Sequence, residues 1–488
     1  MRVLSKILLF LLLVWAASGG GNPVRATASV SDDTEMCIAC HASVTPGAVA
    51  DWKKSRHAEE GAEEAVGCAE CHCMNPGKHA DSFEHNGYRV HMVVTTADCA
   101  SCHEEEAGQY SRNIMSRAYG NLADNALYSD LVKSVNGPHV FDGVKISQRA
   151  QDGQTDFDSC FYCHGTKVRV TGRSTRDTVM GEMTFPVLSG WPNQGVGRVN
   201  PDGSLGSCAS CHARHRFSIA MARKPYTCAE CHKGPDVPAF KVYMVSKHGN
   251  MFSAEGDEWD FEAEPWTVGR DFTAPTCAVC HISRVETDEG EVVAERTHQM
   301  SDRLPWRIFG PLYAHAHPKS PDTSKIKNRA GLALPVELTG EPVSKFLIDA
   351  DEQARRRSAM QAVCLSCHGS SWVEGHFTRM EHTIETTNEV TRASTALMLT
   401  AWERGAASGL DVGESIFDEA IEKKWVEGWL FFANSTRFAS AMTGADYGVF
   451  ANGRWALSRN VEEIADWLAL QLKVKNHPEQ IEKKGDGK

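Results

Sequence analysis

Sixteen of the seventeen cysteines in this 488-residue chain occur in pairs separated by two residues, and a histidine follows each pair. Two cysteines at this spacing share one helical turn and can form thioethers with the two vinyl groups on one edge of a haem, while the adjoining histidine supplies an imidazole to the iron. Zinc sites and disulfides are the alternatives for paired cysteines, but neither requires a histidine after every second cysteine. The eight motifs are Cys37-Cys40-His41, Cys68-Cys71-His72, Cys99-Cys102-His103, Cys160-Cys163-His164, Cys208-Cys211-His212, Cys228-Cys231-His232, Cys277-Cys280-His281 and Cys364-Cys367-His368.

This pattern predicts eight covalently bound haem c groups, and therefore an octahaem c-type cytochrome. Cys73 is the one cysteine left over, and we interpret it as a structural thiol that is buried or half-exposed.

Haem iron can take a second axial ligand opposite the motif histidine. The chain has 21 histidines, and eight of them belong to the motifs, which leaves thirteen. Eight distal ligands are needed if every iron is six-coordinate and seven if one iron stays open for a substrate. Since only His477 lies in the C-terminal tail, the supply covers both cases. The local sequence favours five of these histidines as distal ligands: His57, His85, His215, His248 and His298.

The N-terminus has the pattern of a secretory signal peptide. Arg2 and Lys6 precede an apolar run from Ile7 to Ala17, and Ala26-Thr27-Ala28 offers small residues for cleavage. Because the run is shorter than the ~20 residues of a membrane span, we expect a signal peptide over residues 1–28 and export to the periplasm or an equivalent compartment, with a retained anchor as the alternative. No other segment is expected to form a stable membrane span. The net charge of -12 disfavours nucleic acid and anionic membrane as partners and suits a cationic protein.

The composition divides the rest of the chain. Over residues 29–375 the uneven spacing of the motifs leaves little room for continuous secondary structure, so we expect short helices and loops around eight haems. Residues 376–475 are rich in Ala, Glu, Leu, Met and Trp, with apolar residues at helical spacing, which predicts long helices that pack together or mediate oligomerisation. Residues 476–488 form a polar tail. The predicted fold class is mainly α.

Four stretches resemble a known family. GWPNQGVGRVNPDGSLGSCASCHARHRFSIAMARKPYTCAECHKGPDVP, followed by YMVSKHGNMF and FTAPTCAVCH, is similar to the octahaem hydroxylamine oxidoreductase and hydrazine dehydrogenase family, and AVCLSCHGSSWVEGHF fits as well. The resemblance implies an exported, mainly helical homotrimer with seven haems ligated by two histidines each. It also implies a five-coordinate fourth haem, held here by Cys160, Cys163 and His164, where a small nitrogen compound binds.

Three further positions take their meaning from this resemblance. The sixth motif is usually followed by an Asp-His pair that accepts and relays protons; here the residues are Asp236 and Val237, so the histidine is missing. In oxidative members a tyrosine of one subunit is bonded covalently to the catalytic haem of its neighbour, and Tyr447 matches that place, although the segment WLFFANSTRFASAM before it has no histidine. Met115 stands about where the family has a histidine after the third motif. It is either an axial ligand or a core methionine, with His139 as the candidate ligand in the second case.

The sequence leaves three hypotheses for function. The first is oxidation of hydroxylamine or hydrazine at the fourth haem, with Asp236 and Tyr447 as catalytic residues and a cytochrome c as electron acceptor. The second is reduction of nitrite, nitric oxide or hydroxylamine in the same pocket. The third is a non-catalytic electron-transfer subunit.

Overall fold

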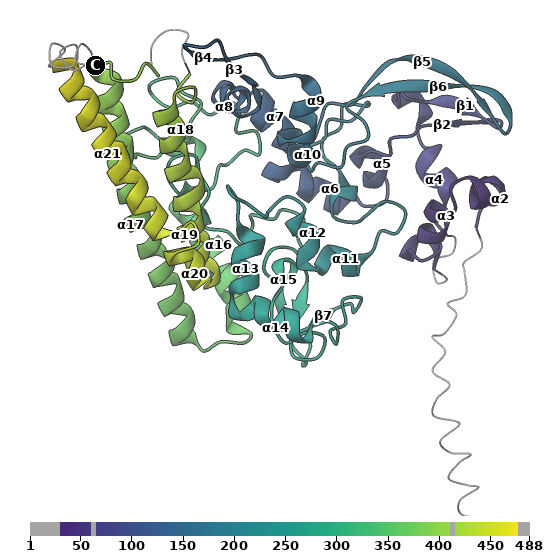
Figure 1. Cartoon of the computed structure of the whole chain (residues 1–488). Coiled ribbons are helices and arrows are strands. Elements are labelled where there is room, and N and C mark those ends of the chain that lie inside the picture. The colour runs from purple at the N-terminus through teal and green to yellow at the C-terminus, as the bar shows by residue number, and fades with distance from the viewer. Residues whose placement is uncertain (1–29, 60–64, 410–414, 477–488) are drawn as a thin grey trace, which may run out of the picture. The chain divides into compact units, whose positions relative to one another are not determined.

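A computed structural model describes residues 30–59, 65–409 and 415–476 of the chain. The predicted signal peptide (1–28) and all but the first residue of the predicted polar tail (476–488) lie outside these ranges. The described chain divides into two compact units. The first comprises the residues up to Met74 with Arg214–Ser218, and the second comprises Asn75–Ala213 with the residues from Ile219 onward. Figure 1 labels the elements of both.

The first unit carries the first two motifs on short helices. Its elements are α2 (Asp32–Val44), α3 (Pro46–Trp52), the 3-10 turn η1 (Arg56–Ala58) and α4 (Cys68–His72). Glu70 on α4 accepts hydrogen bonds from Ser31 Oγ (2.8 Å), which caps α2, and from Thr34 Oγ1 (3.1 Å) on α2. The helices of the first and second motifs are therefore tied together by one carboxylate.

The first cysteine of every motif lies in a helix or a 3-10 turn, as the haem attachment pattern predicts. The main-chain N–H of the motif histidine donates to the carbonyl of the first cysteine, for example from His232 to Cys228 at 2.8 Å and from His368 to Cys364 at 2.9 Å. The helical elements between Asn75 and Leu365 are η2 (Pro76–Lys78), α5 (Thr96–Ala100), α6 (Glu104–Ser111), η3 (Ile114–Arg117), α7 (Ala118–Ala123), α8 (Ala126–Asn136), α9 (Gly153–Asp158), α10 (Cys160–His164), η4 (Cys208–Ser210), α11 (Ile219–Arg223), α12 (Pro225–Ala229), α13 (Ala239–Val245), α14 (Lys247–Glu255), α15 (Cys277–His281), η5 (Ser344–Phe346) and α16 (Ala350–Leu365).

The strands of the second unit form small sheets between these helices. The longest pair is the antiparallel hairpin β5 (Arg169–Thr178) and β6 (Gly181–Ser189), whose register runs from Arg169↔Ser189 to Thr178↔Gly181. Strand β8 pairs with β7 in parallel and with β9 in antiparallel orientation, and the remaining pairs are antiparallel. The other strands are β1 (Phe83–His85), β2 (Tyr88–Val90), β3 (His139–Phe141), β4 (Ile146–Gln148), β7 (Trp266–Thr267), β8 (Val285–Glu286), β9 (Val292–Ala294), β10 (Trp306–Arg307) and β11 (His315–Ala316).

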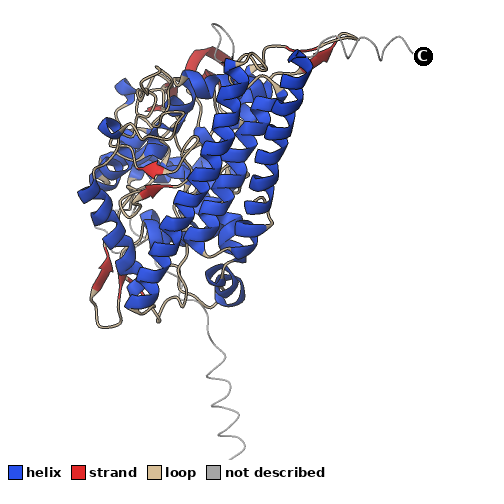
Figure 2. Cartoon of the chain, turned by 90° about the vertical axis from the view of Figure 1, so that its left-hand side faces the viewer, coloured by secondary structure: helices blue, strands red, loops and turns tan. Residues whose placement is uncertain are grey.

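Long helices occupy the C-terminal part of the second unit, and the mainly α fold is confirmed. Helix α17 (Ser370–Glu403) has 34 residues, and it packs beside α19 and α21, as Figures 1 and 2 show. It begins ahead of residue 376, so the expected domain boundary falls inside this helix. The remaining elements are α18 (Ala420–Val426), the π-helical turn η6 (Glu427–Phe432), α19 (Ala433–Met442), α20 (Ala445–Val449) and α21 (Arg454–Asn476).

Tryptophans form the centre of the C-terminal core. Trp402, Trp425 and Trp429 pack with Ile464 and Leu468 in one buried cluster. The indole N–H groups of two of them find acceptors, since Trp402 donates to Glu422 Oε1 (2.8 Å) and Trp425 to a threonine hydroxyl (3.1 Å). This satisfies the polar edge of a large apolar side chain and fixes the packing of α17 against α18 and α21. Within the described residues, no helix combines the length and apolarity that a membrane crossing requires.

Candidate active site

Two pairs of histidine rings face each other across a gap that fits a haem iron. The ring centroids of His212 and His298 are 6.4 Å apart, and those of His248 and His368 are 6.1 Å apart. Two metal–nitrogen bonds of about 2.0 Å, with about 1.1 Å from each nitrogen to its ring centre, give a separation of roughly 6.2 Å for two imidazoles on one metal. The spacing therefore fits His298 as the ligand opposite the fifth motif and His248 as the ligand opposite the eighth.

Cysteines of different motifs lie in contact. Because a thioether forms at the edge of the porphyrin, contact between cysteines of two motifs brings the two haem edges together. The motifs joined in this way are the third with the fifth, the fourth with the sixth and the sixth with the seventh. In each of these pairs one thiol shifts the pKa of the other: Cys99 with Cys208, Cys163 with Cys231, and Cys228 with Cys277. No disulfide joins any of the seventeen cysteines, all of which lie in the described ranges, and Cys73 is half-buried, which raises the pKa of its thiol.

The fourth motif holds its histidine in a defined orientation. Helix α10 runs from Cys160 to His164, and His164 Nδ1 lies 3.2 Å from the carbonyl oxygen of Ala118 at the start of α7. Because a carbonyl oxygen can only accept, Nδ1 carries the proton and Nε2 is the nitrogen left to bind iron. Burial lowers the pKa of His164, which further favours the neutral imidazole that a metal needs.

Glycines let a loop lie directly on this motif. A Cβ on Gly195 would lie 2.2 Å from Gly165 N and 2.9 Å from Cys163 O, and a Cβ on Gly197 would lie 2.7 Å from His164 O. Val196 N donates to Cys163 O (3.1 Å) in the same contact. The backbone approaches too closely for any side chain, so this loop fixes the position of the motif from one side.

Asp236 lies close to the fourth and sixth motifs. Burial lowers the pKa values of His164 and His232, whereas the carboxylate of Asp236 raises both. The negative charge of Asp236 therefore lies near both imidazoles. Its main-chain carbonyl accepts a hydrogen bond from Asn434 Nδ2 on α19 (3.1 Å). The structure thus brings Asp236 to the motif that the sequence assigned to catalysis, and the C-terminal helices help to position its loop.

Tyr447 and Val237 meet in one apolar cluster. Tyr447, on α20, and Val237 are both partly buried and pack against the buried cluster of Val242, Phe438 and Ala439. Burial and the neighbouring Asp446 raise the pKa of the Tyr447 phenol. The two positions that the family resemblance singles out, 237 and 447, therefore border the same apolar cluster.

The other predicted ligands occupy different surroundings. The ring of His57 meets Phe217 edge-on at 5.0 Å in the first unit, where His215 adopts a left-handed backbone with φ 65°. His85 lies near Phe83 on β1, at 6.0 Å between ring centroids. Met115 is half-buried in η3, whereas His139 is exposed on β3.

Sequence reasoning did not single out two groups of buried histidines. His79 and His91 stack at 3.6 Å between ring centroids, which is too close for an iron between them, and His79 Nε2 lies 3.0 Å from Asp98 Oδ1. His315 lies on β11 and is 3% exposed, and His317 directly follows this strand and is 5% exposed. Alternating histidines in a Tyr-Ala-His-Ala-His run were the signal that could have marked the second group.

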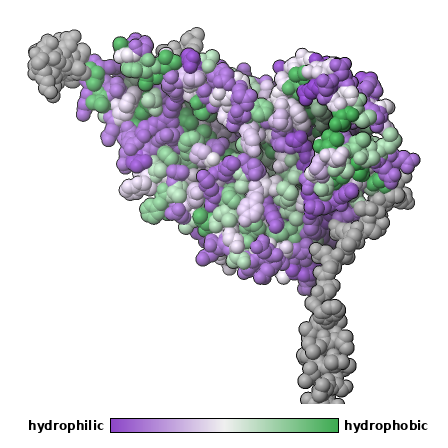
Figure 3. Space-filling model, turned by 45° about the vertical axis from the view of Figure 1, so that its right-hand side comes forward, coloured by the Kyte–Doolittle hydropathy of each residue, from purple (hydrophilic) through white to green (hydrophobic). Residues whose placement is uncertain are grey.

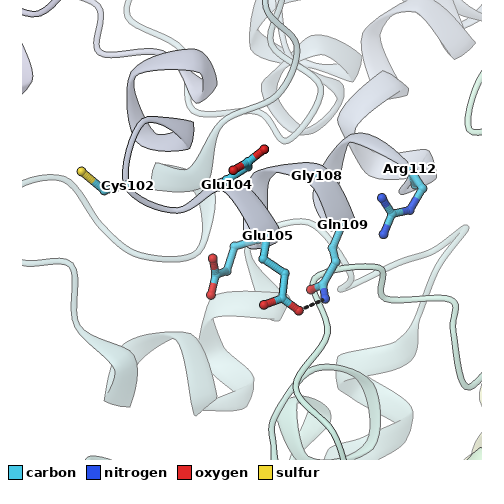
Figure 4. A pocket seen from close by; sticks show the side chains of 7 residues that line it. Cys102, Glu104, Glu105, Gly108, Gln109 and Arg112 are labelled. Atoms are coloured by element: carbon cyan, nitrogen blue, oxygen red, sulfur yellow. Dashed lines mark hydrogen bonds between the residues drawn. The ribbon is translucent and has the colours of Figure 1, made fainter.

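A cavity of about 650 Å³ lies beside the third motif. Figure 4 shows its wall, in which the exposed Cys102 lies beside side chains of α6, with Gln109 Nε2 donating to Glu105 Oε1 (3.0 Å). Figure 3 shows hydrophobic residues reaching the surface among hydrophilic ones. Tyr162 and Tyr226, in the fourth motif and just before the sixth, are 53% and 56% exposed, as expected for surface that a porphyrin would cover.

Helical turns carrying Cys-x-x-Cys-His, facing imidazoles at iron-ligand spacing and adjoining motif edges define a multihaem c-type cytochrome that binds haem c covalently. Residues 202–311 match the family model described as "Seven times multi-haem cytochrome CxxCH". A solved structure named "Hypothetical multiheme protein" is 37% identical, with a TM-score of 0.84, over 92% of this chain and 97% of that one. The chain therefore belongs to the multihaem c-type cytochromes.

Two relatives from Kuenenia stuttgartiensis are more distant. A probable nitrite reductase-hydroxylamine oxidoreductase fusion protein is 26% identical over 358 residues, which is 69% of this chain. The chain spans about a third (34%) of the length of that relative. A chain of the reducing HAO-like protein complex is 17% identical with a TM-score of 0.61, over 92% of this chain and 87% of that one, and it shares the fold.

Proposed function

We propose that this chain reduces a small nitrogen compound, with nitrite as the first candidate, at a haem held by Cys160, Cys163 and His164. The observation that carries the proposal is the cluster that contains Tyr447 and Val237. By resemblance, position 447 corresponds to the cross-linking tyrosine of oxidative enzymes, and position 237 corresponds to their relay histidine. Here the tyrosine ring packs on its own chain, and valine replaces the histidine.

Proton chemistry supports the reductive direction. Oxidation of hydroxylamine releases protons that a base and a relay must carry away, and the side chain of Val237 can neither accept nor pass on a proton. Reduction of nitrite to nitric oxide takes up one electron and two protons and releases water. Asp236 can hold a proton at its carboxylate near the reacting atoms. The positive charge of Lys233, in the same loop, lies near Cys163.

The chain's own residues prepare the site for haem. A bound five-coordinate haem supplies an iron that binds the substrate nitrogen and exchanges electrons with it, and the neighbouring haems conduct those electrons. His164 presents its Nε2 to the iron, and the loop at Gly195 prevents the motif from shifting. The proximity of Cys163 and Cys231 supports the view that a haem held by the sixth motif would pass electrons to one held by the fourth.

Partners and location are part of the proposal. The wall of the cavity at Cys102 carries Glu104, Glu105 and Glu106, which suits docking of a cationic cytochrome beside the third haem. Next to Tyr447, the side chains of Phe450 and Trp455 are 69% and 66% exposed, and this apolar surface supports assembly with further copies, as a homotrimer. The predicted signal peptide supports export to the periplasm or an equivalent compartment.

Substitution of the proposed proton donor tests the reaction. Asp236→Asn should lower kcat for nitrite reduction by reduced viologen about a hundredfold, since a positioned acid contributes on the order of 10²–10⁴. Asp446→Asn, a matched control beside Tyr447, should leave the rate unchanged. Val237→His should raise the rate of hydroxylamine oxidation relative to nitrite reduction. Full nitrite turnover in Asp236→Asn would contradict the assigned role.

Hydroxylamine oxidation is the second candidate function. The presence of a tyrosine at position 447 favours it, because a covalent bond from this residue to the catalytic haem of a neighbouring subunit marks oxidative enzymes. A denaturing gel stained for haem separates the two candidates, since a cross-linked trimer survives boiling and a non-covalent assembly does not.

A further inference from the structure

Two arginines of the second unit are buried without a carboxylate partner among the described residues. Arg437 on α19 is 0% exposed and Arg307 on β10 is 9% exposed. Arg437 donates to Asn388 Oδ1 (2.7 Å) and Asn434 Oδ1 (3.2 Å), which are neutral groups. The Nε of each arginine is buried with no hydrogen-bond partner in the described structure.

The two guanidinium groups belong to one region. Arg437 also donates to the carbonyl oxygen of Ile308, the residue after Arg307 (3.4 Å). Arg307 lies over the ring of Phe309 (5.1 Å), and Phe309 stacks with Phe438, the residue after Arg437 (6.4 Å). Strand β10 and helix α19 are therefore in contact, and the charges of both arginines reach the buried His315.

Among the described residues, the groups that act on these arginines include no carboxylate. Burial is the main reason why the pKa of the His315 imidazole is lowered to about 3, and the positive charges of Arg307 and Arg437 add to this shift. The Nε2 of His315 has no hydrogen-bond partner in the described structure. Burial lowers the pKa of Arg437 to about 9, and the acidic group that opposes this shift is the phenol of Tyr313. At neutral pH Arg437 therefore stays mostly charged.

An unpaired buried charge costs several kcal/mol, which a structure recovers when an anion pairs with it. Guanidinium groups match planar anions with two oxygens in bidentate geometry. We propose that Arg437 and Arg307 form a binding site for such an anion. Its source is either a propionate of a covalently bound haem or free nitrite.

The position of the site ties it to the fourth and sixth motifs. Asn434, which accepts from Arg437, also donates to the main chain of Asp236, the residue that acts on His164 and His232. These contacts make the fourth and sixth haems, when bound, the candidates whose propionate would reach the arginines. The nitrite source rests on the proposed function, whereas the propionate source does not.

Substitutions that remove the charge and keep the length separate the two sources. In the holoprotein, Arg437→Met should lower the midpoint potential of one haem if the anion is a propionate, because loss of a nearby cation favours the oxidised iron. If the anion is nitrite, the Kd for nitrite in an absorbance titration should rise at least roughly tenfold, with unchanged potentials. Arg437→Lys should restore most of either effect, and the exposed Arg329→Met should show neither.

Unchanged potentials and an unchanged nitrite Kd in both Arg437→Met and Arg307→Met would overturn the site. If these variants do not fold, a cryo-EM structure of the wild-type holoprotein with nitrite decides the question. A carboxylate or nitrite oxygen in hydrogen-bond contact with either guanidinium supports the site, and water alone overturns it. A shifted potential in a protein that reduces no nitrite would reject the proposed function and retain the site.

Discussion

The loop on the fourth motif makes a sharp steric prediction for Gly195→Ala. The added Cβ would lie 2.2 Å from Gly165 N, 2.5 Å from Gly165 Cα and 2.9 Å from Cys163 O. All three are backbone atoms, so no side chain can rotate away and the loop or the motif must move. Overpacking of this kind costs about 1–3 kcal/mol, and the backbone contacts place the expected loss at about 3 kcal/mol.

The assay compares the guanidinium midpoint of unfolding and the haem content of Gly195→Ala with those of the wild-type holoprotein. Gly153→Ala is the matched control, because Gly153 begins α9 just before the fourth motif and a Cβ there meets nothing within 4 Å. The control should change the free energy of unfolding by less than about 1 kcal/mol. A Gly195→Ala protein with the wild-type midpoint and full haem content would refute the close approach of the loop to the motif.

Three further predictions test other parts of the molecule. Burial raises the pKa of Glu422 from 4.5 to about 7, so the folded state binds this proton more tightly than the unfolded state. Its contribution to stability is present below about pH 4.5 and is lost as the pH rises through 7, by up to about 3 kcal/mol, and Glu422→Gln should show a flatter stability profile in denaturant titrations between about pH 5 and pH 8. His248→Ala should convert one haem to a high-spin ferric signal in electron paramagnetic resonance, whereas the exposed His382→Ala should not; identical spectra would remove His248 as a ligand. On a boiled denaturing gel, the haem stain should appear at the monomer position, and a band at three times that mass, absent in Tyr447→Phe, would contradict the reductive proposal.

The haem motifs and the fold class could be predicted from the local sequence. Spacing of two cysteines and a histidine is a property of one helical turn, so α10 and α15 could be predicted from five residues each. The C-terminal helices followed from the period of their apolar residues. The helix α17 begins earlier than the predicted boundary at residue 376, because only Gly369, its N-cap, separates His368 of the eighth motif from Ser370.

Partners that are distant in sequence could not be predicted in the same way. His298 lies 86 residues after His212, and His248 lies 120 residues before His368, so the pairing depends on how the intervening chain folds. The buried Arg437 was missed because an arginine in a helix normally reaches solvent. Nothing in its flanking residues shows that α19 is enclosed on all sides.

The most direct test is a comparison of the two reaction directions in one preparation of the wild-type holoprotein. Nitrite-dependent oxidation of reduced viologen and hydroxylamine-dependent reduction of cytochrome c are measured as initial rates at the same pH and temperature. The structure around Asp236, Val237 and Tyr447 predicts that kcat/KM for nitrite reduction exceeds that for hydroxylamine oxidation. A higher value for hydroxylamine oxidation would contradict the proposed direction, and no turnover in either direction would contradict catalysis at the fourth motif.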